Sequence, residues 1–476
     1  MLNTHNDKIS DWTTGSLDGK ATEFRYAAER NRLEFMLPGE GADQLEYFNV
    51  QDIVGVLPLN PGNQGSEYYL LHVSNKSSPG NYGSLESANV KNLPSSFIEE
   101  FSPSLIANVT TKTPILLHVL VSVGSGNQRA EQCFASLVEP LLGRLKTSLS
   151  VDCVVVRTTS ATTISEYTTK KILPYANEGR KQSIMLLSGD GGVVDLINAL
   201  ALKSSPSLSY TKPTVALIPL GTANALATSL HVAEDTTMGL STWYRGTSKP
   251  LPAFVAKFSD GAELVIDEGS NTEPCPRNSS DEAMFYGSVV CSWGLHASLV
   301  ADSDNKEYRK LGSSRFEKAA NALLYPPNEA GPHRYKAKVS LLKADKSGNA
   351  TWRAMPEDTH VYVLVTLVSN LEKTFTISPE TEPLDGQLRL IYIRASNGDE
   401  IMRLMNCAYD SGKHVHDPNV IYEEVEGLKI DFDGRETCDR WRRVCIDGKI
   451  FIVEPNGSIE VMKNAKSVVD IFVPRK

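Results

Sequence analysis

The residues best suited to chemistry lie in the segment 183–200, which reads SIMLLSGDGGVVDLINAL. Its centre is a glycine loop, SGDGG at 188–192, that carries a single acid, Asp190. Glycines let backbone N–H groups approach a ligand closely, and such groups bind anions together with the positive end of a following helix. A carboxylate beside bound phosphates is costly unless metal or proton chemistry uses it. The loop therefore predicts a phosphate site in which Asp190 serves one of these two roles.

Two strand-and-helix patterns position this loop. Ile184–Leu187 is a continuous apolar run, typical of a parallel strand buried on both faces, and Val193–Leu200 has the apolar spacing of a mostly buried helix. Thr214–Ile218 is a second such strand, followed in 219–230 by a turn and a helix-forming stretch that includes Asn224. Because ligands of open α/β sheets bind at the carboxyl ends of the strands, we expect the two loops to lie side by side.

Composition limits the function classes. The chain has 476 residues, of which 41% are apolar and 22% charged, as in ordinary soluble globular proteins. A net charge of −9 argues against nucleic-acid binding and restricts contact with an anionic membrane to a local patch. The polar N-terminus does not resemble a signal peptide, and no apolar run approaches the ~20 residues of a membrane span. We therefore expect a cytoplasmic protein. Its seven cysteines, without CxxC pairs, fit reduced thiols.

The patterns divide the chain into four regions. Residues 1–31 are polar and are expected to be poorly ordered, and 32–105 alternate short apolar runs with turn residues, which predicts a small β-rich module. Residues 112–250 alternate buried strands with helices, which predicts a Rossmann-like α/β domain. Residues 251–476 contain many strand-like runs separated by turns, which predicts an antiparallel β-sandwich. The expected fold class is therefore α/β plus β.

The two loops resemble those of a known family. SGDGGVVDLINAL and PLGTANALATSL are similar to the GGDG and PLGTGND or PAGSGNALA signatures of the diacylglycerol kinase and sphingosine kinase superfamily. Ser188 and the NALA segment at 224–227 are more similar to sphingosine kinases, whereas PLGT at 219–222 matches the diacylglycerol kinase signature. The resemblance implies a nucleotide-binding domain of the NAD-kinase and diacylglycerol-kinase type, a lipid-binding β-sandwich, and ATP and Mg²⁺ as cofactors.

The resemblance also implies roles for particular residues. Asp190 would accept the proton of a lipid's primary hydroxyl as that oxygen attacks the γ-phosphoryl group of ATP. The alternative is that Asp190 only caps a following helix. Arg309 and Arg315, in a block similar to EKYRRLGxxRF, would reach the ATP phosphates. The other residues implied to contact ATP are Ser125, Gly126, Thr158, Ser188, Gly189, Gly191, Gly192, Asp195, Gly221, Thr222 and Asn224.

The same block gives a clue to the substrate. Asp302 lies where sphingosine kinases hold the carboxylate that pairs with the substrate's amino group, and Asp304 is the alternative because an insertion is implied. Such a carboxylate suits a sphingoid ammonium but has nothing to pair with in a neutral diacylglycerol. A solvated loop position is the other interpretation of Asp302. Asp447 matches the family's VDGE segment and would help to hold Mg²⁺ through water, and PLDGQL at 383–388 matches the DGxL hairpin, a structural signature.

Several positions depart from the family pattern. They are Ser122, Val123, Gly124, Gly192, Asp195, Ala223 and Lys449, which replaces the Glu of VDGE. The leading hypothesis is a kinase of sphingoid long-chain bases that makes peripheral contact with intracellular membranes, with diacylglycerol or ceramide as alternative substrates. The departures motivate a second hypothesis, a catalytically weakened lipid or nucleotide sensor. A soluble NAD kinase is disfavoured, because it has no place for the segments 221–227, 308–316 and 383–388. The sequence does not indicate an oligomeric state.

Overall fold

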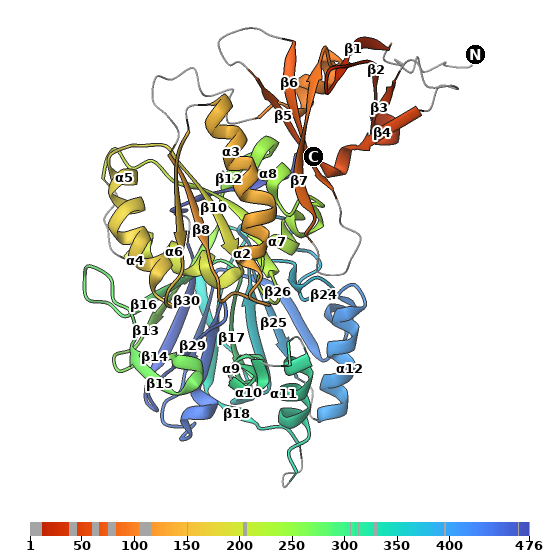
Figure 1. Cartoon of the computed structure of the whole chain (residues 1–476). Helices are drawn as coiled ribbons and strands as arrows, with labels where there is room; N and C mark the ends of the chain where they lie inside the picture. The colour runs from red at the N-terminus through yellow and green to blue at the C-terminus, as the bar shows by residue number, and fades with distance from the viewer. Residues whose placement is uncertain are drawn as a thin grey trace.

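The computed structural model shows an N-terminal module, an α/β region and a β domain in succession (Figure 1). No helix in the described part of the chain is long and apolar enough to cross a membrane. The described residues are 12–37, 45–59, 66–74, 82–103, 116–149, 151–202, 207–304, 306–309, 311–312, 314–327, 331–394, 397–464 and 466–475.

The N-terminal module is a seven-stranded antiparallel sheet in the order β4-β3-β2-β1-β7-β6-β5. Its elements are β1 (Thr13–Leu17), β2 (Lys20–Ala27), β3 (Arg32–Met36), β4 (Leu45–Asn49), β5 (Ile53–Pro58), β6 (Glu67–Ser74), β7 (Ser84–Lys91) and α1 (Ser95–Phe101). We expected 1–31 to be poorly ordered, but this does not hold for residues 13–27, which form β1 and β2. Phe24 and Tyr26 alternate with polar residues there and enter an apolar core with Phe97 and Phe101 of α1.

The edge strand β5 fixes this module to the α/β region through α8 (Leu240–Arg245). The Tyr244 hydroxyl donates a hydrogen bond to the carbonyl oxygen of Val56 at 3.0 Å. A Cβ at Gly55 would lie 2.4 Å from the Tyr244 ring, so glycine allows this close approach. The Arg245 guanidinium lies 4.3 Å from the ring centroid of Phe101. The contact therefore joins buried Tyr244 and half-buried Arg245 to the N-terminal module.

The α/β region is built on a six-stranded sheet in the order β12-β31-β11-β10-β8-β9, in which only β12 is antiparallel. The strands are β8 (Leu116–Val121), β9 (Asp152–Arg157), β10 (Gln182–Ser188), β11 (Thr214–Pro219), β12 (Thr247–Pro250) and β31 (Asp470–Val473). The helices are α2 (Ala130–Cys133), α3 (Glu139–Ser148), α4 (Thr163–Tyr167), α5 (Leu173–Asn177), α6 (Asp190–Leu202) and α7 (Ala225–Ser229), with π-helical turns at Phe134–Val138 and Thr168–Ile172. Residues 470–473 fall within 251–476, the region predicted to be the sandwich, but they form β31, which pairs with β11 and β12 of the α/β sheet. A short apolar run predicts a strand and not its partner.

The β domain contains two antiparallel sheets whose facing side chains form one apolar core, including Phe254, Trp293, Phe432 and Phe451. One sheet has the order β16-β13-β30-β27-β19-β20 and the other β15-β14-β29-β28-β17-β22-β25-β26. The first consists of β13 (Ala253–Phe258), β16 (Met284–Gly287), β19 (Lys338–Ala344), β20 (Ala350–Ala354), β27 (Gly427–Asp431) and β30 (Ser458–Asn464). The second consists of β14 (Glu263–Ile266), β15 (Asn271–Pro274), β17 (Val290–Gly294), β22 (Tyr362–Thr366), β25 (Leu388–Ile393), β26 (Val420–Val425), β28 (Arg443–Ile446) and β29 (Lys449–Ile452). The expected combination of helices and sheets with a β-rich C-terminal region is confirmed.

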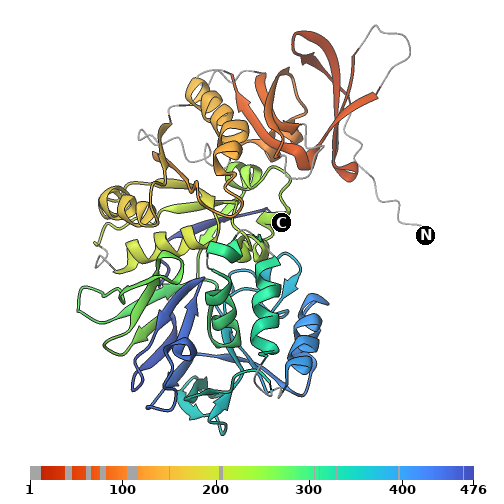
Figure 2. The ribbon, with the colours of Figure 1, turned by 60° about the horizontal axis from the view of Figure 1, so that its bottom comes forward.

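Helices cover the outer face of the eight-stranded sheet, as Figure 2 shows. They are α9 (Leu295–Ser303), α10 (Lys306–Arg309), α11 (Ser314–Leu324) and α12 (Gly398–Tyr409), and the small ribbons beside them are β18 (Tyr335–Lys336) with β21 (Thr359–His360) and β23 (Asn370–Glu372) with β24 (Phe375–Thr376). Leu323 and Leu404 from these helices pack with Leu364 and Ile391 of the sheet. The same apolar cluster continues into α6 and α7, so the β domain and the α/β region share a core.

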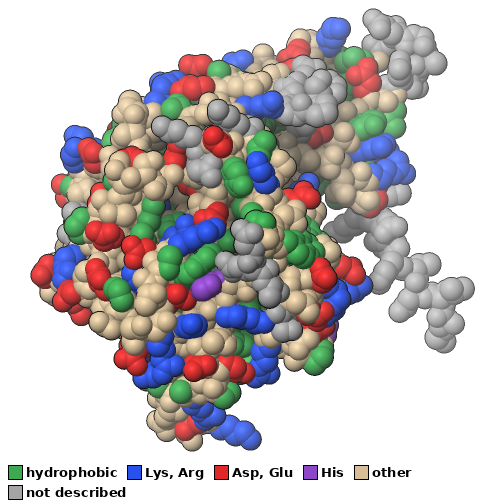
Figure 3. Space-filling model, turned by 90° about the horizontal axis from the view of Figure 1, so that it is seen from below, with side chains coloured by type: hydrophobic (Ala, Val, Ile, Leu, Met, Phe, Trp, Pro, Cys, Tyr) green, Lys and Arg blue, Asp and Glu red, His purple; other side chains and the backbone are tan. Residues whose placement is uncertain are grey.

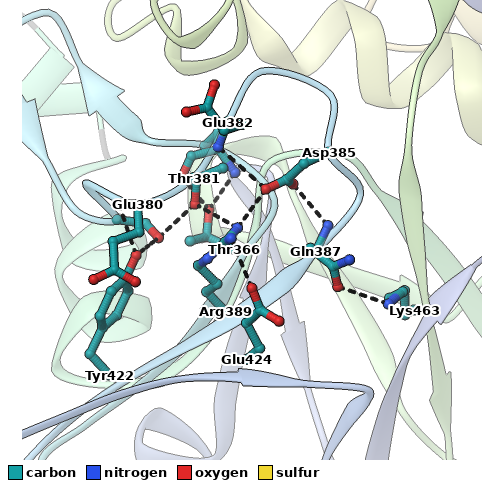
Figure 4. A network of polar contacts seen from close by, with 12 residues as sticks. Thr366, Glu380, Thr381, Glu382, Asp385, Gln387, Arg389, Tyr422, Glu424 and Lys463 are labelled. Carbon is teal, nitrogen blue, oxygen red and sulfur yellow. Dashed lines mark hydrogen bonds and ion pairs between the residues drawn. The ribbon is translucent and has the colours of Figure 1, made fainter. Parts of the chain in front are cut away.

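The DGxL hairpin is held by a polar network around Arg389 (Figure 4). The Arg389 guanidinium donates hydrogen bonds to Asp385 at 2.7 Å and to Glu424 at 3.0 Å, although its side chain is only 8% exposed. Asp385 also accepts the backbone N–H of Gln387 at 2.9 Å. Asp385 thus shapes the turn and neutralises a buried cation, which explains physically why this hairpin uses an acid.

Candidate active site

Three loops meet at the carboxyl edge of the parallel sheet. They follow β8, β10 and β11, which are neighbours in the sheet. A Cβ at Gly189 would lie 2.7 Å from the Cα of Gly221, and a Cβ at Gly221 would lie 2.5 Å from the Cα of Gly189. Gly126 has a φ of +50° and would place a Cβ 2.3 Å from the carbonyl oxygen of Leu220. Only glycines allow these backbones to touch, so the loops form one continuous surface of main-chain groups.

Polar side chains tie the loops to one another. The Ser125 hydroxyl accepts a hydrogen bond from the N–H of Gly189 at 3.1 Å, which joins the first loop to the second. Asn224 has left-handed backbone geometry, and its amide oxygen accepts the N–H of Gly221 at 2.7 Å. Thr158, after β9, accepts the N–H of Val123 at 3.1 Å. In this structure Ser125, Thr158 and Asn224 thus shape the loops.

The remaining loop residues differ in exposure. Ser188 is buried at the end of β10, and Gly192 packs against it, because a Cβ at Gly192 would lie 2.6 Å from the Ser188 hydroxyl. This contact explains glycine at 192, where the family pattern has threonine. A Cβ at Gly191 would meet nothing within 4 Å, and Thr222 is exposed. The surface of the loops therefore opens beside Gly191 and Thr222.

The glycine contact gives a testable consequence. Gly221→Ala is expected to lower the free energy of unfolding by about 1–3 kcal/mol, because the new methyl group overlaps the backbone of Gly189. It should also weaken ATP binding, because the second and third loops must move apart. Gly191→Ala is the matched control for stability, since its Cβ points into open space. Denaturant unfolding of both variants and calorimetric ATP titration of Gly221→Ala test this, and equal free energies of unfolding for the two variants would contradict the close loop contact.

Asp190 joins the second loop to the third. It is the first residue of α6, and its two carboxylate oxygens accept the N–H groups of Ala225 at 2.9 Å and Leu226 at 3.0 Å. These donors belong to the first turn of α7, so Asp190 caps the helix of the other loop. Burial raises the pKa of Asp190, and the two N–H donors offset part of that effect. The structure thus directs Asp190 towards Asn224 and its loop, and the capping alternative describes a contact that does occur.

A second carboxylate faces Asp190 from the β domain. Asp447 lies in the turn between β28 and β29 and is 6% exposed. It accepts the N–H groups of Ser288 at 2.6 Å, Val289 at 3.0 Å and Val290 at 2.7 Å. Burial raises the pKa of Asp447 to about 7, and the nearby charge of Asp190 adds to the rise. The negative charges of Asp190 and Asp447 therefore interact across the boundary between the α/β region and the β domain.

Asp190 and Asp447 are better suited to a Mg²⁺ ion that is bound partly by water and phosphate than to a metal site made only of protein ligands. Within the described residues, no group of three or more His, Cys, Asp or Glu side chains is arranged to hold a metal ion. Mg²⁺ is normally bound by one or two carboxylates, waters and substrate phosphates. Asp190 in the second loop and Asp447 in the β28–β29 turn supply two carboxylates whose charges interact, and this donor set fits a Mg²⁺ ion that also takes ligands from water and phosphate.

Comparisons with known proteins bear on this arrangement of loops. Residues 117–255 match the family model of the diacylglycerol kinase catalytic domain. These residues are similar in sequence to that domain. The chain is 22% identical to human sphingosine kinase 1 over 379 residues, covering 72% of this chain and 87% of that protein. It is 22% identical to rat sphingosine kinase 1 over 340 residues, covering 67% and 82%. The resemblance predicted from the two loops is confirmed, and the matches support an ATP-dependent lipid kinase.

Solved structures also align with this chain. A crystal structure of a putative diacylglycerol kinase from Bacillus anthracis str. Sterne aligns with a TM-score of 0.47 and 17% identity, covering 76% of this chain and 98% of that chain. A second diacylglycerol kinase structure from the same organism aligns with a TM-score of 0.44 and 14% identity over the same shares.

The helix α6 of the kinase domain carries two further polar contacts to the β domain. Asp195 forms an ion pair with Lys449 of β29, with 2.8 Å between Oδ1 and Nζ. Asn198, three residues later, accepts the N–H of Tyr286 at 2.8 Å and donates to its carbonyl oxygen at 2.9 Å. Burial raises the pKa of Asp195, and Lys449 partly offsets the rise. Both residues of α6 therefore face the β domain.

The predicted substrate acids of the kinase have arginine partners. Asp302 lies in α9. Its Oδ2 is 2.7 Å from Nη2 of Arg440, and its Oδ1 is 2.7 Å from Nη2 of Arg443. Asp304 lies 3.6 Å from Arg315. The RWRR segment at 440–443 is visible in the sequence, but its pairing with α9 is a long-range contact that local patterns do not reveal. Arg309 belongs to α10, and its side chain lies outside the described residues.

Proposed function

We propose that this kinase transfers the γ-phosphoryl group of ATP to the primary hydroxyl of a lipid, with Asp190 as general base. The observation that carries the proposal is the backbone contact between the glycine loops, with Asp190 held between them by Ala225 and Leu226. A sphingoid long-chain base is the first candidate acceptor, because the curated relatives are sphingosine kinases.

The loops would hold the nucleotide through main-chain N–H groups. The amino end of α6, a helix of 13 residues, adds positive potential beside Gly191. Mg²⁺, when bound, would neutralise charge on the phosphoryl groups, and Asp447 and Asp190 are the residues that would hold it through water. Both acids already accept backbone hydrogen bonds, so the site is organised before the ligands arrive.

Asp190 would then receive the proton of the attacking hydroxyl. The carboxylate offers about four acceptor positions, and backbone N–H groups occupy at most three of them. Burial raises the pKa of Asp190 and so favours its protonated form, which strengthens Asp190 as a base. The proton therefore passes from the lipid oxygen to Asp190 as the bond to phosphorus forms.

A neutral lipid alcohol, such as diacylglycerol or ceramide, is the second candidate acceptor. It is favoured by the contacts of Asp302, whose carboxylate already lies between the guanidinium groups of Arg440 and Arg443. A carboxylate with two cationic partners has less to offer a sphingoid ammonium. Peripheral contact with intracellular membranes is part of the proposal, and a view of the β domain from below supports it. Positive and hydrophobic side chains gather near the middle of that face (Figure 3).

Transfer from γ-labelled ATP to separate lipid classes tests the proposal. We expect labelled phosphate in at least one of a sphingoid base, a ceramide and a diacylglycerol. Thermal stabilisation by Mg·ATP without transfer to any lipid would instead favour the weakened sensor.

Asp302→Asn separates the two acceptors. We expect it to change kcat/KM for a sphingoid base and for a neutral lipid by the same factor, because Arg440 and Arg443 already match the charge of Asp302. The measurement is kcat/KM for both lipids with wild type and variant. A selective loss of about tenfold or more for the sphingoid base would show that Asp302 pairs with its ammonium group.

A further inference from the structure

A cluster of three polar side chains lies between α9 and the outer face of the eight-stranded sheet. The hydroxyl of Ser292, in β17, and Nδ1 of His296, in α9, form a hydrogen bond of 2.7 Å. The ring centroid of His296 lies 6.0 Å from that of Tyr362, on the neighbouring strand β22, and the rings are inclined at 72°. Ser292 and Tyr362 are buried, whereas His296 is partly exposed. The cluster therefore extends from the surface into the packing of α9 on the sheet.

The hydroxyl group of Tyr362 is available to a ligand. The side chain is 2% exposed and packs among apolar residues such as Leu295 and Leu364, and its oxygen has no hydrogen-bond partner among the described residues. Burying an unpaired hydroxyl is costly, and native proteins pair most such groups. On the next strand, β25, the hydroxyl of Tyr392 is paired, because it donates to Nδ1 of His360 at 3.0 Å. Tyr362 is thus a buried donor and acceptor that folding alone does not explain.

The cluster lies on the two strands that hold Asp447. Val290, at the start of β17, donates its N–H to Asp447 at 2.7 Å, and Ser292 follows two residues later. Cys445, directly opposite Ser292 on β28, precedes Asp447 by two residues. The charge of Asp190 acts on Asp447 in turn. Two residues of a strand span about 7 Å, so a lipid whose reacting hydroxyl lies at these acids can also reach the cluster.

The cluster is neutral and can both donate and accept hydrogen bonds. Burial lowers the pKa of His296 to about 4, so its ring carries no charge near neutral pH. The hydroxyls of Ser292 and Tyr362 and a neutral imidazole each contain a donor and an acceptor. An ammonium or a phosphate group would find no opposite charge in these three side chains, whereas a hydroxyl group matches them in both directions.

We propose that Tyr362, His296 and Ser292 bind a second hydroxyl group of the acceptor lipid and so determine which lipid alcohols are phosphorylated. The inference rests on the proposed function, because it requires the reacting hydroxyl to lie at Asp190. A site built to pair a substrate hydroxyl discriminates against an analogue that lacks it. The favoured acceptors therefore carry a free hydroxyl close to the reacting one, as a sphingoid base or a ceramide does. A diacylglycerol has ester oxygens instead and offers the cluster no donor.

Steady-state kinetics of the full chain with matched lipids test this role. The value of kcat/KM is measured for sphinganine and 3-deoxysphinganine, and for a ceramide and its 3-deoxy analogue. Tyr362→Phe removes only the hydroxyl group. We expect it to lower kcat/KM about tenfold for the lipids with the 3-hydroxyl and to leave the values for the 3-deoxy lipids unchanged. The thermal midpoint of this variant should be unchanged or raised, because the lost hydroxyl has no partner.

Tyr392→Phe is the matched control. Tyr392 is 1% exposed and lies in the same sheet, but its hydroxyl is paired with His360. This variant should have a lower thermal midpoint and wild-type kcat/KM for every lipid. Equal losses for the 3-hydroxylated and 3-deoxy lipids in Tyr362→Phe, or a lower thermal midpoint in that variant, would overturn the inference. Wild-type enzyme that prefers diacylglycerol or the 3-deoxy lipids would overturn it and leave the proposed function in place. Wild-type protein that transfers phosphate to no lipid would overturn both.

Discussion

Asp190→Asn is expected to reduce phosphoryl transfer to lipid by about 10²- to 10⁴-fold while ATP binding persists. An amide cannot take the proton of the attacking hydroxyl, but its oxygen can still accept one of the two N–H groups of Ala225 and Leu226. The loops should therefore stay assembled. The measurements are kcat at saturating lipid, the Kd of Mg·ATP and the free energy of unfolding.

A matched variant separates proton transfer from capping. Asp235 lies outside the three loops and caps α8. It accepts hydrogen bonds from the N–H of Thr242 at 3.1 Å and from the hydroxyl of Ser241 at 2.8 Å. Asp235→Asn weakens a comparable helix cap. This variant should transfer phosphate to lipid at the wild-type rate. If Asp190→Asn lost no more activity than Asp235→Asn at similar stability, Asp190 would be a capping residue alone.

Asp385→Ala is expected to lower the free energy of unfolding by about 3 kcal/mol, because it strips a buried cation of its nearest acid. Arg389 is 8% exposed, and Glu424, its other partner, is 61% exposed and compensates less well. Denaturant unfolding measures the loss. Asp433→Ala is the control, since Asp433 pairs with Lys338 at 2.7 Å with both side chains 54% exposed. That change should cost about 0–1 kcal/mol. Similar losses in both variants would contradict the structural role of the hairpin.

The centre of the site was predictable because its signals are local. A continuous apolar run such as Ile184–Leu187 predicts a buried parallel strand, and a glycine cluster after it predicts a loop that admits close backbone contact. Two such units in succession place their loops at the same sheet edge. The contact of Gly189 with Gly221 agrees with this expectation.

The partners of the site residues were not predictable, because they come from distant parts of the chain. Asp190 accepts N–H groups of α7, Asp447 accepts those at 288–290, and Asp302 pairs with Arg440 and Arg443. No periodicity reports such long-range pairing. The same reason explains why residues 470–473 were assigned to the sandwich region.

Hydrogen exchange of the full chain with and without Mg·ATP tests the central claim most directly. The claim is that three glycine-lined loops hold the triphosphate beside Asp190. We predict slowed exchange of the backbone amides at 122–129, 188–193 and 219–226 when Mg·ATP is added. Unchanged exchange in all three loops, under conditions in which Mg·ATP binds, would contradict it.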